Sequence, residues 1–189
     1  MSYPPLYLLR HGQTEWNRDR RIQGQVESVL TEEGRGHAAR QGEILAGLAL
    51  PEGVEAWCSP QVRTRQTAEI ALPRAGLVPD FDDRLKEVFL GDWEGRYYPE
   101  LIAAQPELAA QSVFRLCLMS NGENEADLRA RIGDFLGTLD APAVVVSHGI
   151  ALTFLRGIVL GLGLDGMEAM EREQGVVIEL RDGTEVTHR

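Results

Sequence analysis

The stretch Leu6-Tyr-Leu-Leu-Arg-His-Gly12 decides how this chain folds. Four apolar residues run into two basic side chains and a glycine, which predicts a fully buried β-strand that ends in a polar turn. Similar apolar runs at 54–58 and 143–147 lead into Ser59-Pro60 and His148-Gly149. We therefore expect a central sheet with chemically active side chains gathered where its strands end.

Helical patterns separate these predicted strands. Thr31 predicts the start of one helix, because its side chain can cap free amides and the two glutamates that follow suit the positive end of the helix dipole. Ser59 as N-cap and Pro60 as first helical residue predict a helix over 60–71. Two more helices are expected, one over the mostly apolar residues 150–160 and one where apolar residues recur at helical spacing: Leu128, Ile132, Phe135, Leu136 and Leu139.

The other segments have no long period. Residues 81–98 are expected to be mainly loop, with short helical pieces following between 99 and 118. Asp182-Gly183 between two strand-like runs predicts a β-hairpin at the end of the chain. Because strands alternate with helices, the sequence predicts an α/β fold, a three-layer sandwich whose mostly parallel central sheet is covered by helices on both faces. Finding neither repeat nor linker, we expect residues 1–189 to form a single domain.

Composition and charge narrow the classes of function. The 189 residues carry a formal net charge of -10, which argues against binding to nucleic acid or to an anionic membrane surface. We find no transmembrane segment and no signal peptide in the sequence, so we expect a cytoplasmic protein. Cys58 and Cys117 each stand among apolar residues, which suits buried thiols in a reducing compartment. A small anionic substrate remains compatible with the charge, because a local cluster of arginines can dominate the field in a cleft.

Three polar clusters follow predicted strands, namely Arg10-His11-Gly12, 59–63 with Arg63, and 147–149 with His148. In α/β sheets ligands bind outside the carboxyl ends of the strands, so we expect the clusters to converge on one spot. We expect each glycine to provide an unusual turn and close approach to the ligand, and the helix near Pro60 to aim its positive end at the site. Guanidinium forks there suit a dianion such as a phosphoryl group.

These residues also resemble a known family. The segment 8–17, which reads Leu-Leu-Arg-His-Gly-Gln-Thr-Glu-Trp-Asn, is similar to the N-terminal signature of the histidine phosphatase superfamily, the phosphoglycerate-mutase-like group. Three further motifs resemble that family in the same order: Ser59-Pro60 with Arg63, Gln66, Thr67 and Ala68; Leu85-Lys86-Glu87 with Gly91, Trp93, Glu94 and Gly95; and Val145-Val146-Ser147-His148-Gly149. The similarity runs from about residue 5 to residue 180.

The resemblance implies a role for each matching residue. His11 would attack phosphorus to form a phosphohistidine, and Arg10, Arg63 and His148 would hold the phosphoryl oxygens. Glu87 would protonate the leaving oxygen and then activate water. Substrate contacts are expected from three more residues: Asn17, Gln23 and Gly149. Because arginines supply the positive charge and lower the pKa of the attacking imidazole, we expect neither a metal nor another cofactor.

The reading favoured is a phosphomonoesterase that hydrolyses a small phosphorylated metabolite, because the acid-bearing segment contains Trp93-Glu94-Gly95 and the chain is short. A mutase-type isomerase with the same nucleophile is the first alternative, and a non-catalytic phosphate-binding protein is the second. Other acids near Glu87 compete for its role: Asp82, Asp83, Asp92 and Glu94. Substrate selection is expected from residues 92–124 and from Gln174, where the family often has asparagine. The sequence leaves open whether the protein forms a homo-oligomer.

Overall fold

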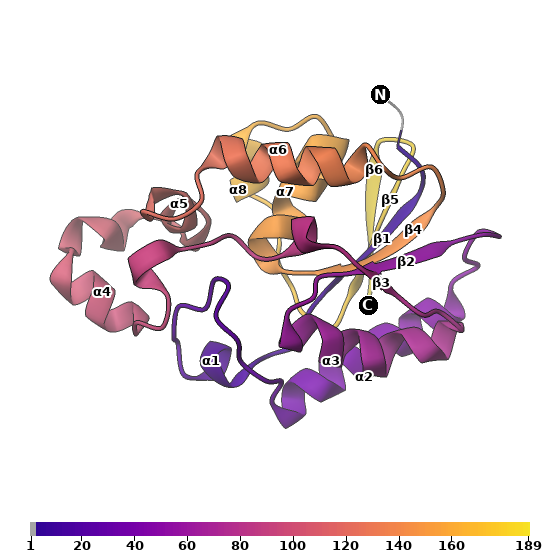
Figure 1. Cartoon of the computed structure of the whole chain (residues 1–189), viewed down its shortest axis with the longest axis horizontal. Coiled ribbons are helices and arrows are strands. Elements are labelled where there is room, and N and C mark those ends of the chain that lie inside the picture. The colour runs from indigo at the N-terminus through magenta and orange to yellow at the C-terminus, as the bar shows by residue number, and fades with distance from the viewer. Residues whose placement is uncertain (1–2) are drawn as a thin grey trace.

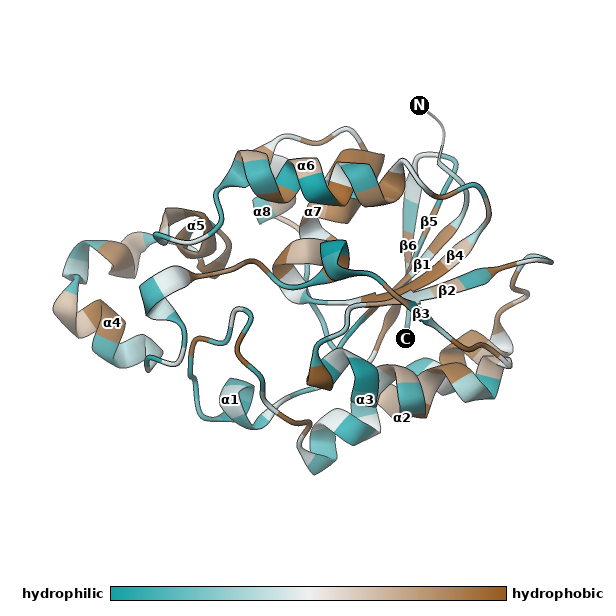
Figure 2. Cartoon of the chain, in the orientation of Figure 1, coloured by the Kyte–Doolittle hydropathy of each residue, from teal (hydrophilic) through white to brown (hydrophobic). Residues whose placement is uncertain are grey.

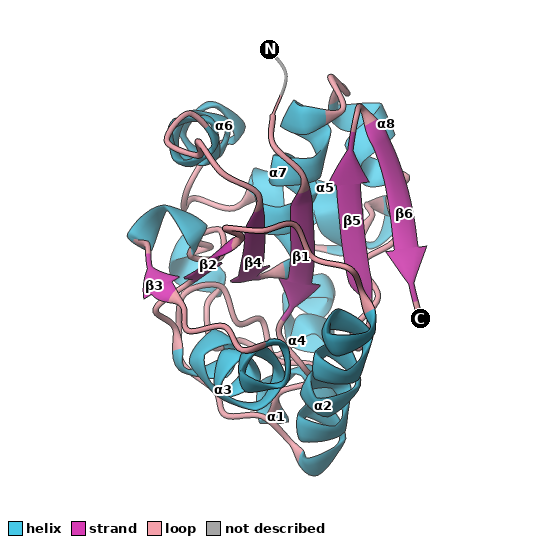
Figure 3. Ribbon diagram, turned by 90° about the vertical axis from the view of Figure 1, so that its right-hand side faces the viewer, coloured by secondary structure: helices cyan, strands magenta, loops and turns pink. Residues whose placement is uncertain are grey.

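The predicted buried strands lie at the centre of a six-stranded sheet with the order β3-β2-β4-β1-β5-β6. The computed structural model describes residues 3–189, and its strands are β1 (Leu6–Arg10), β2 (Glu55–Cys58), β3 (Asp80–Phe81), β4 (Ala143–Ser147), β5 (Val177–Arg181) and β6 (Thr184–His188). The first four strands in the spatial order are parallel, and β5 and β6 are antiparallel to their neighbours. Figure 3 shows β5 running opposite to β1. The expected mostly parallel sheet is confirmed.

Helices cover both faces of this sheet, as predicted. The helices are α1 (Glu15–Arg18), α2 (Glu32–Gly47), α3 (Val62–Ala71), α4 (Tyr98–Ala104), α5 (Val113–Met119), α6 (Glu125–Leu136), α7 (Gly149–Val159) and α8 (Leu164–Glu168). In Figure 1, α2 and α3 lie on one side of the strands, and α6 and α7 lie on the other. The elements α4 and α5 project beyond the sheet as a lobe on the left of that view. None of the helices within residues 3–189 is long and apolar enough to cross a membrane.

Alternation along the strands divides the core into two layers. Leu8 and Val145 belong to the cluster packed beneath α6 and α7, whereas Leu9 and Val146 belong to the cluster packed against α2 and α3. Successive side chains of a strand point to opposite faces, so a strand covered on both faces must be apolar throughout. Figure 2 shows hydrophobic colour along β1 and β4, the two central strands. This is why four apolar residues in a row before Arg10 predicted the strand correctly.

Of the two helix starts that the sequence predicted, the one at Thr31 is confirmed and the one at Pro60 is not. The Thr31 side chain accepts a hydrogen bond from the Gly34 amide and caps α2, and Asn124 caps α6 in the same way through the Asp127 amide. The predicted start at Pro60 is wrong, because α3 begins at Val62 and has no side-chain cap. The Ser59 hydroxyl bonds to a histidine of the candidate site instead, as described below.

The C-terminal hairpin has the turn that its sequence predicted. Asp182 and Gly183 both have positive φ angles, 52° and 72°, between β5 and β6. Two central residues in this region form the turn that matches the twist of a two-residue hairpin. The two-residue strand β3 lies at a region that we expected to be loop. So short a strand at the edge of the sheet gives the sequence no periodic pattern to reveal it.

Candidate active site

The three predicted clusters meet at the carboxyl edge of the sheet. β1 ends at Arg10, β2 ends just before Ser59, and β4 ends just before His148. The rings of His11 and His148 lie with their centroids 5.2 Å apart, and the Arg63 side chain reaches them from the second residue of α3. The convergence expected from the positions of the strands is therefore confirmed.

One hydrogen bond fixes the tautomer of His11. Its Nδ1 lies 2.8 Å from the carbonyl oxygen of Gly12, so Nδ1 carries the proton and Nε2 carries the lone pair. The ring is 3% exposed, and His11 lines the cavity described below. Burial, followed by the charges of Arg63 and Arg10, lowers the pKa of His11 well below its usual value near 6.5. His11 is thus held as a neutral imidazole.

His148 is buried behind this first histidine. Its Nδ1 accepts a hydrogen bond of 3.1 Å from Nε of Arg63, which leaves the proton on Nε2 to be donated to the Ser59 hydroxyl at 2.8 Å. Burial, followed by the charge of Arg63, lowers the pKa of His148 as well. Both ring nitrogens contact protein groups, and His148 is not among the residues that line the cavity. The hydrogen bond from Arg63 shows that His148 orients the guanidinium of that residue.

The guanidinium of Arg63 is fixed on three sides. Besides its bond to His148, Nη1 donates to the Val26 carbonyl at 3.1 Å and Nη2 donates to the Gly24 carbonyl at 2.7 Å. Burial lowers the pKa of Arg63 to about 10, so the group stays positively charged at neutral pH. Two N–H groups of the five remain for a ligand. Such a fixed fork needs no rearrangement before it binds an anion.

Arg10 brings a second buried guanidinium to the same place. Its Nη1 donates to the carbonyl of Arg172, whereas its Nε is buried and has no hydrogen-bond partner within the described chain. Burial lowers the pKa of Arg10, and the nearby Glu87 carboxylate opposes that effect. An unpartnered buried donor is rare in native proteins, because leaving it unbonded is costly. The orphaned Nε is therefore a donor suited to an anion in the cavity.

Glu87 is held at the start of α7. Its carboxylate accepts hydrogen bonds from the amides of Ile150 at 3.2 Å and Ala151 at 3.0 Å. The backbone of Glu87 is fixed too, because Gln61 accepts from its amide at 2.9 Å and Gln25 donates to its carbonyl at 3.0 Å. The carboxylate lines the cavity together with His11 and both arginines.

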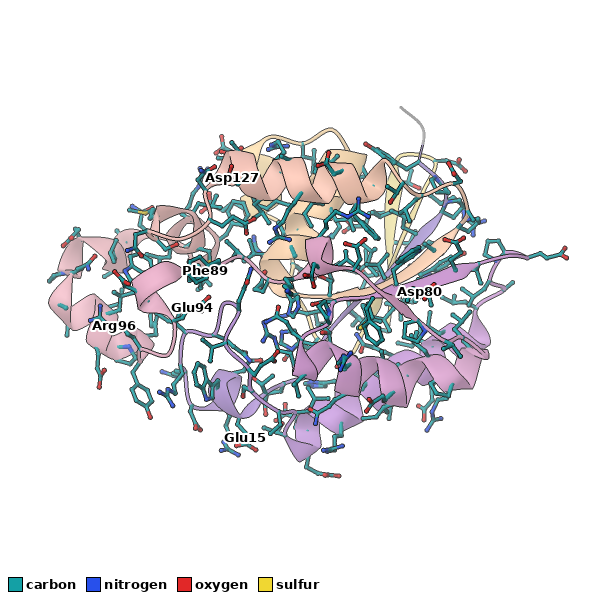
Figure 4. All side chains as sticks on the ribbon, viewed as in Figure 1. Glu15, Asp80, Phe89, Glu94, Arg96 and Asp127 are labelled. Atoms are coloured by element: carbon teal, nitrogen blue, oxygen red, sulfur yellow. The ribbon has the colours of Figure 1, made fainter. Side chains whose placement is uncertain are left out.

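The competing acids are engaged elsewhere. Asp82 pairs with Arg84, and Asp83 pairs with Lys86. Asp92 accepts a hydrogen bond from Asn121 at an exposed position. Glu94, labelled in Figure 4 on the segment that leads to the lobe, accepts from the amides of Gln25 at 2.7 Å and Leu90 at 3.1 Å. Among the residues that line the cavity in the described chain, Glu87 is the only acid.

Asn17 and Gln23 lie on another wall of the cavity, near one another. Thr14 caps α1 together with Asn17, and the Thr14 hydroxyl donates to Oε1 of Gln23 at 3.1 Å. This bond leaves Nε2 of Gln23 buried and without a partner in residues 3–189. Gln23 is 8% exposed, so its amide is a second orphaned donor at the cavity.

The two glycines that follow the histidines, Gly12 and Gly149, do not act as the sequence suggested. Neither Gly12 nor Gly149 has a positive φ angle, so neither supplies an unusual turn. A Cβ at Gly12 would lie 2.1 Å from the Gly34 carbonyl oxygen, so this glycine allows α2 to approach the backbone. Gly149 does line the cavity, and a Cβ there would lie 3.4 Å from the Arg10 guanidinium carbon.

The predicted role for the start of α3 is also wrong. The amide of Val62, the first residue of that helix, donates to the Glu27 carboxylate at 2.9 Å, so a protein side chain occupies this position. The helix whose first backbone amides serve the site is α7, where the amides of Ile150 and Ala151 hold the Glu87 carboxylate. The sequence signal for it is the glycine after His148 followed by an apolar helical run, a pattern that carries no conventional cap.

A cavity of about 550 Å³ opens over these groups. It is lined at one end by His11, Arg10, Arg63 and Glu87, and it extends toward the lobe formed by α4 and α5. Gln174, which the sequence analysis associated with the substrate side, lines it and donates to the His11 carbonyl at 2.9 Å. Arg172 is a lining residue that the sequence analysis missed, because no motif marks it.

The site combines a neutral imidazole that has one free nitrogen with fixed guanidinium groups and one acid. This combination is typical of enzymes that transfer phosphoryl groups through histidine. Comparisons with known proteins define this class further. Residues 6–186 match the Histidine phosphatase superfamily (branch 1). The chain belongs to the histidine phosphatase superfamily.

Individual relatives carry names of two kinds. A probable phosphoglycerate mutase, GpmB, of Citrobacter koseri is 37% identical over 164 residues, which cover 83% of this chain and 75% of that protein. The solved structure of mycobacterial glucosyl-3-phosphoglycerate phosphatase with VO3 has a TM-score of 0.79 and 28% identity, and the match covers 94% of this chain and 92% of that one. Bacillus stearothermophilus YhfR has a TM-score of 0.78 and 31% identity, with 97% and 94% covered.

Proposed function

We propose that this protein hydrolyses phosphate monoesters through a phosphohistidine at His11. The observation that carries the proposal is the state of that imidazole: its Nδ1 bonds to the Gly12 carbonyl, its pKa is lowered, and no described protein group bonds to Nε2. Only a neutral imidazole has a lone pair with which to attack phosphorus. Arg10 and Arg63 bind the phosphoryl oxygens, and His148 keeps Arg63 in place.

The first step transfers the phosphoryl group to the enzyme. The lone pair of His11 Nε2 forms an N–P bond while the P–O bond to the leaving group breaks. The electron pair of that bond goes to the leaving oxygen, which takes a proton from Glu87 and departs as an alcohol. The guanidinium groups stabilise the charge that spreads over the three equatorial oxygens.

The second step returns the enzyme to its starting state. Glu87, now a carboxylate held by the α7 amides, accepts a proton from a water molecule. The water oxygen forms a P–O bond as the N–P bond breaks, and the electron pair returns to Nε2 of His11. Inorganic phosphate leaves, and Glu87 has regained its proton.

The names of the relatives point to two reactions, hydrolysis of the phosphate ester and a mutase reaction. The curated relative is named as a phosphoglycerate mutase, whereas one of the two solved structures is named as a phosphatase. The segment 93–95 reads Trp-Glu-Gly, which the resemblance associates with phosphatases. This feature favours transfer to water. A mutase would return the phosphoryl group to a second hydroxyl of the same molecule.

The test combines chemistry with product analysis. Wild type should hydrolyse an aryl phosphate in the presence of excess EDTA, because the arginines supply the positive charge, and His11→Ala should have no activity. With 3-phosphoglycerate, release of inorganic phosphate supports the hydrolase, and formation of the 2-phospho isomer without phosphate release supports the mutase. Full activity of His11→Ala, or complete loss of wild-type activity with the chelator, would contradict the proposed mechanism.

A further inference from the structure

The cavity over His11 has two chemically distinct ends. The end beside the sheet holds the charged groups described above. The other end extends into the lobe, where its wall is apolar and is formed by Ile22, Val88, Leu90, Trp93, Leu101 and Leu116. Four of these residues also pack in the small cluster inside the lobe: Leu101 and Leu116 are buried in it, and Ile22 and Trp93 pack against it. The lobe thus builds a wall for the part of a substrate that lies beyond its phosphoryl group.

The apolar wall itself carries few polar groups, and the amides of Asn17 and Gln23 lie on another wall of the cavity. Cys117 lines it, and burial raises the pKa of this thiol to about 12, so the group is neutral. Glu87 is the one acid among the lining residues of the described chain, and it is engaged at the phosphoryl end. The hydroxyl groups of a sugar would lose their bonds to water here without gaining equivalent partners, which is unfavourable.

Two arginines that line the cavity near this end, Arg172 and Arg21, are committed to the protein, whereas the exposed Arg20 lines it as well. Arg172 donates through Nε to the Thr153 hydroxyl at 3.1 Å and through Nη2 to the Met167 carbonyl at 3.0 Å, and its guanidinium lies over the Phe114 ring. Arg21 donates to the Gly95 carbonyl at 3.0 Å and lies over two aromatic rings. Their role at the cavity is to close its wall around the apolar end.

Taking the proposed phosphomonoesterase activity as its basis, the geometry points to a substrate whose leaving group is an apolar, ring-bearing alcohol. The volume of about 550 Å³ accommodates a phosphoryl group and a ring together, since pockets for small ligands span roughly 300–1,000 Å³. Trp93 and Tyr98 add aromatic rings to the lining, against which a ring of the substrate can pack. Burial of the ring contributes binding energy that a polar sugar does not.

The test compares esters that share an alkoxide leaving group. Ethyl phosphate engages only the phosphoryl end, 2-phenylethyl phosphate adds a ring, and glucose 6-phosphate adds hydroxyl groups. We expect kcat/KM for 2-phenylethyl phosphate to exceed that for ethyl phosphate by about 10- to 100-fold, the effect of burying one ring. Glucose 6-phosphate should be no better than ethyl phosphate. A ratio near one, or a preference for the sugar, overturns the inference.

Two leucines of the lobe provide a matched pair of variants. Leu116 and Leu108 are 5% and 4% exposed and pack in the same small cluster, but only Leu116 lines the cavity. Leu116→Asn should lower the phenylethyl-to-ethyl ratio about tenfold, whereas Leu108→Asn should change it by less than about twofold. If Leu116→Asn does not fold, Val113→Asn at the exposed rim should lower the same ratio. An unchanged ratio in a folded lining variant overturns the inference.

A binding measurement separates this inference from the proposed function. The phosphonates 2-phenylethylphosphonate and ethylphosphonate cannot be hydrolysed, and titration calorimetry gives their affinities without any turnover. Tighter binding of the ring-bearing phosphonate with no hydrolysis of any ester supports the pocket and contradicts the phosphatase activity. Equal affinities together with hydrolysis of ethyl phosphate support the activity and overturn the inference.

Discussion

At His11, one hydrogen bond to a backbone carbonyl decides which ring nitrogen can react. The Gly12 carbonyl can accept only from a protonated Nδ1, so the lone pair lies on Nε2. Buried guanidinium groups then disfavour a second proton on the ring. Residue-level chemistry therefore depends on two separate features, the direction of one carbonyl and the nearby positive charge.

Histidine titration tests this arrangement directly. Because burial and the arginines lower the pKa of His11 and of His148, both rings should stay neutral in folded protein as the pH falls below about 6.5. The unfolded chain takes up protons there and the folded chain does not, so the free energy of unfolding should fall with acidification over that range. Imidazole NMR, assigned with His11→Asn and His148→Gln, measures the midpoints. Midpoints at or above 6.5 would contradict the account.

The loss of rate when Glu87 is replaced should depend on the basicity of the leaving group. Glu87→Gln should slow single-turnover phosphorylation by an alkyl phosphate by about 10² to 10⁴, because an alkoxide needs a proton in order to leave. Phosphorylation by nitrophenyl phosphate should slow much less, and phosphoenzyme should then accumulate as a burst, since hydrolysis also needs Glu87. Glu94→Gln is the matched control, because its carboxylate holds two backbone amides and should affect both substrates alike. If Glu87→Gln slowed phosphorylation by the two substrates equally, Glu87 would not be the group that protonates the leaving oxygen.

At the scale of elements, α6 holds the segment that carries Glu87. Arg131 on that helix forms a two-pronged ion pair with Glu123 at 2.5 and 2.8 Å. The same guanidinium donates to the carbonyl oxygens of Arg84 at 2.6 Å and Glu87 at 3.3 Å. One side chain therefore joins α6 to both ends of the segment 84–87.

Removing this connection should cost stability. Arg131→Met leaves the Glu123 carboxylate, which is 13% exposed, without its partner and should lower the free energy of unfolding by about 1–3 kcal/mol. On the same helix, Arg129 forms an exposed pair with Glu125, so Arg129→Met should cost less than about 1 kcal/mol. Urea unfolding of both variants gives the comparison. Equal losses would show that the segment 84–87 is held by other contacts.

The sequence predicted those elements whose signals are local. The continuous apolar runs in β1 and β4 and the cap at Thr31 depend on neighbouring residues, and each was correct. The start of α3 was not, because Ser59 bonds to His148, which is 89 residues away in the sequence. A capping signal predicts what a side chain can do locally, and it does not reveal a more favourable partner brought by the fold.

The site shows the same limit. Motifs that follow the strands predicted which residues meet, because the carboxyl ends of parallel strands share one edge. They did not predict that the first amides of α7, rather than those of α3, serve the site, since Glu27 from a distant loop accepts from the first amide of α3. The apolar end of the cavity has no motif at all. Its residues come from several segments between Ile22 and Ile150, and only the packing of the lobe brings them together.

For the whole molecule, the anion site exists only in the folded chain. Arg10 ends β1 and Arg63 belongs to α3, and the chain as a whole carries a net charge of -10. Unfolding therefore disperses the positive charges among an excess of acids. An anion that binds the cluster should bind the native state alone.

Orthovanadate should raise the unfolding temperature for this reason. At 100 times its dissociation constant, a ligand of the native state adds about 2.7 kcal/mol to the free energy of unfolding. Arg10→Met should remove most of this effect, and Arg129→Met, a substitution on an exposed face of α6, should retain it. Thermal melts at several vanadate concentrations make the comparison. An equal shift in Arg10→Met would place the anion elsewhere.

The central claim is that the phosphoryl group passes through His11, and rapid quenching of a single turnover tests it most directly. Wild type mixed with an aryl phosphate should give a phosphoenzyme that is stable to base and labile to acid, and mass spectrometry at high pH should locate the phosphate on His11. Glu87→Gln should increase its amount, and His11→Ala should form none. Phosphate on a serine, stable to acid, or turnover without any phosphoenzyme in Glu87→Gln would contradict the account.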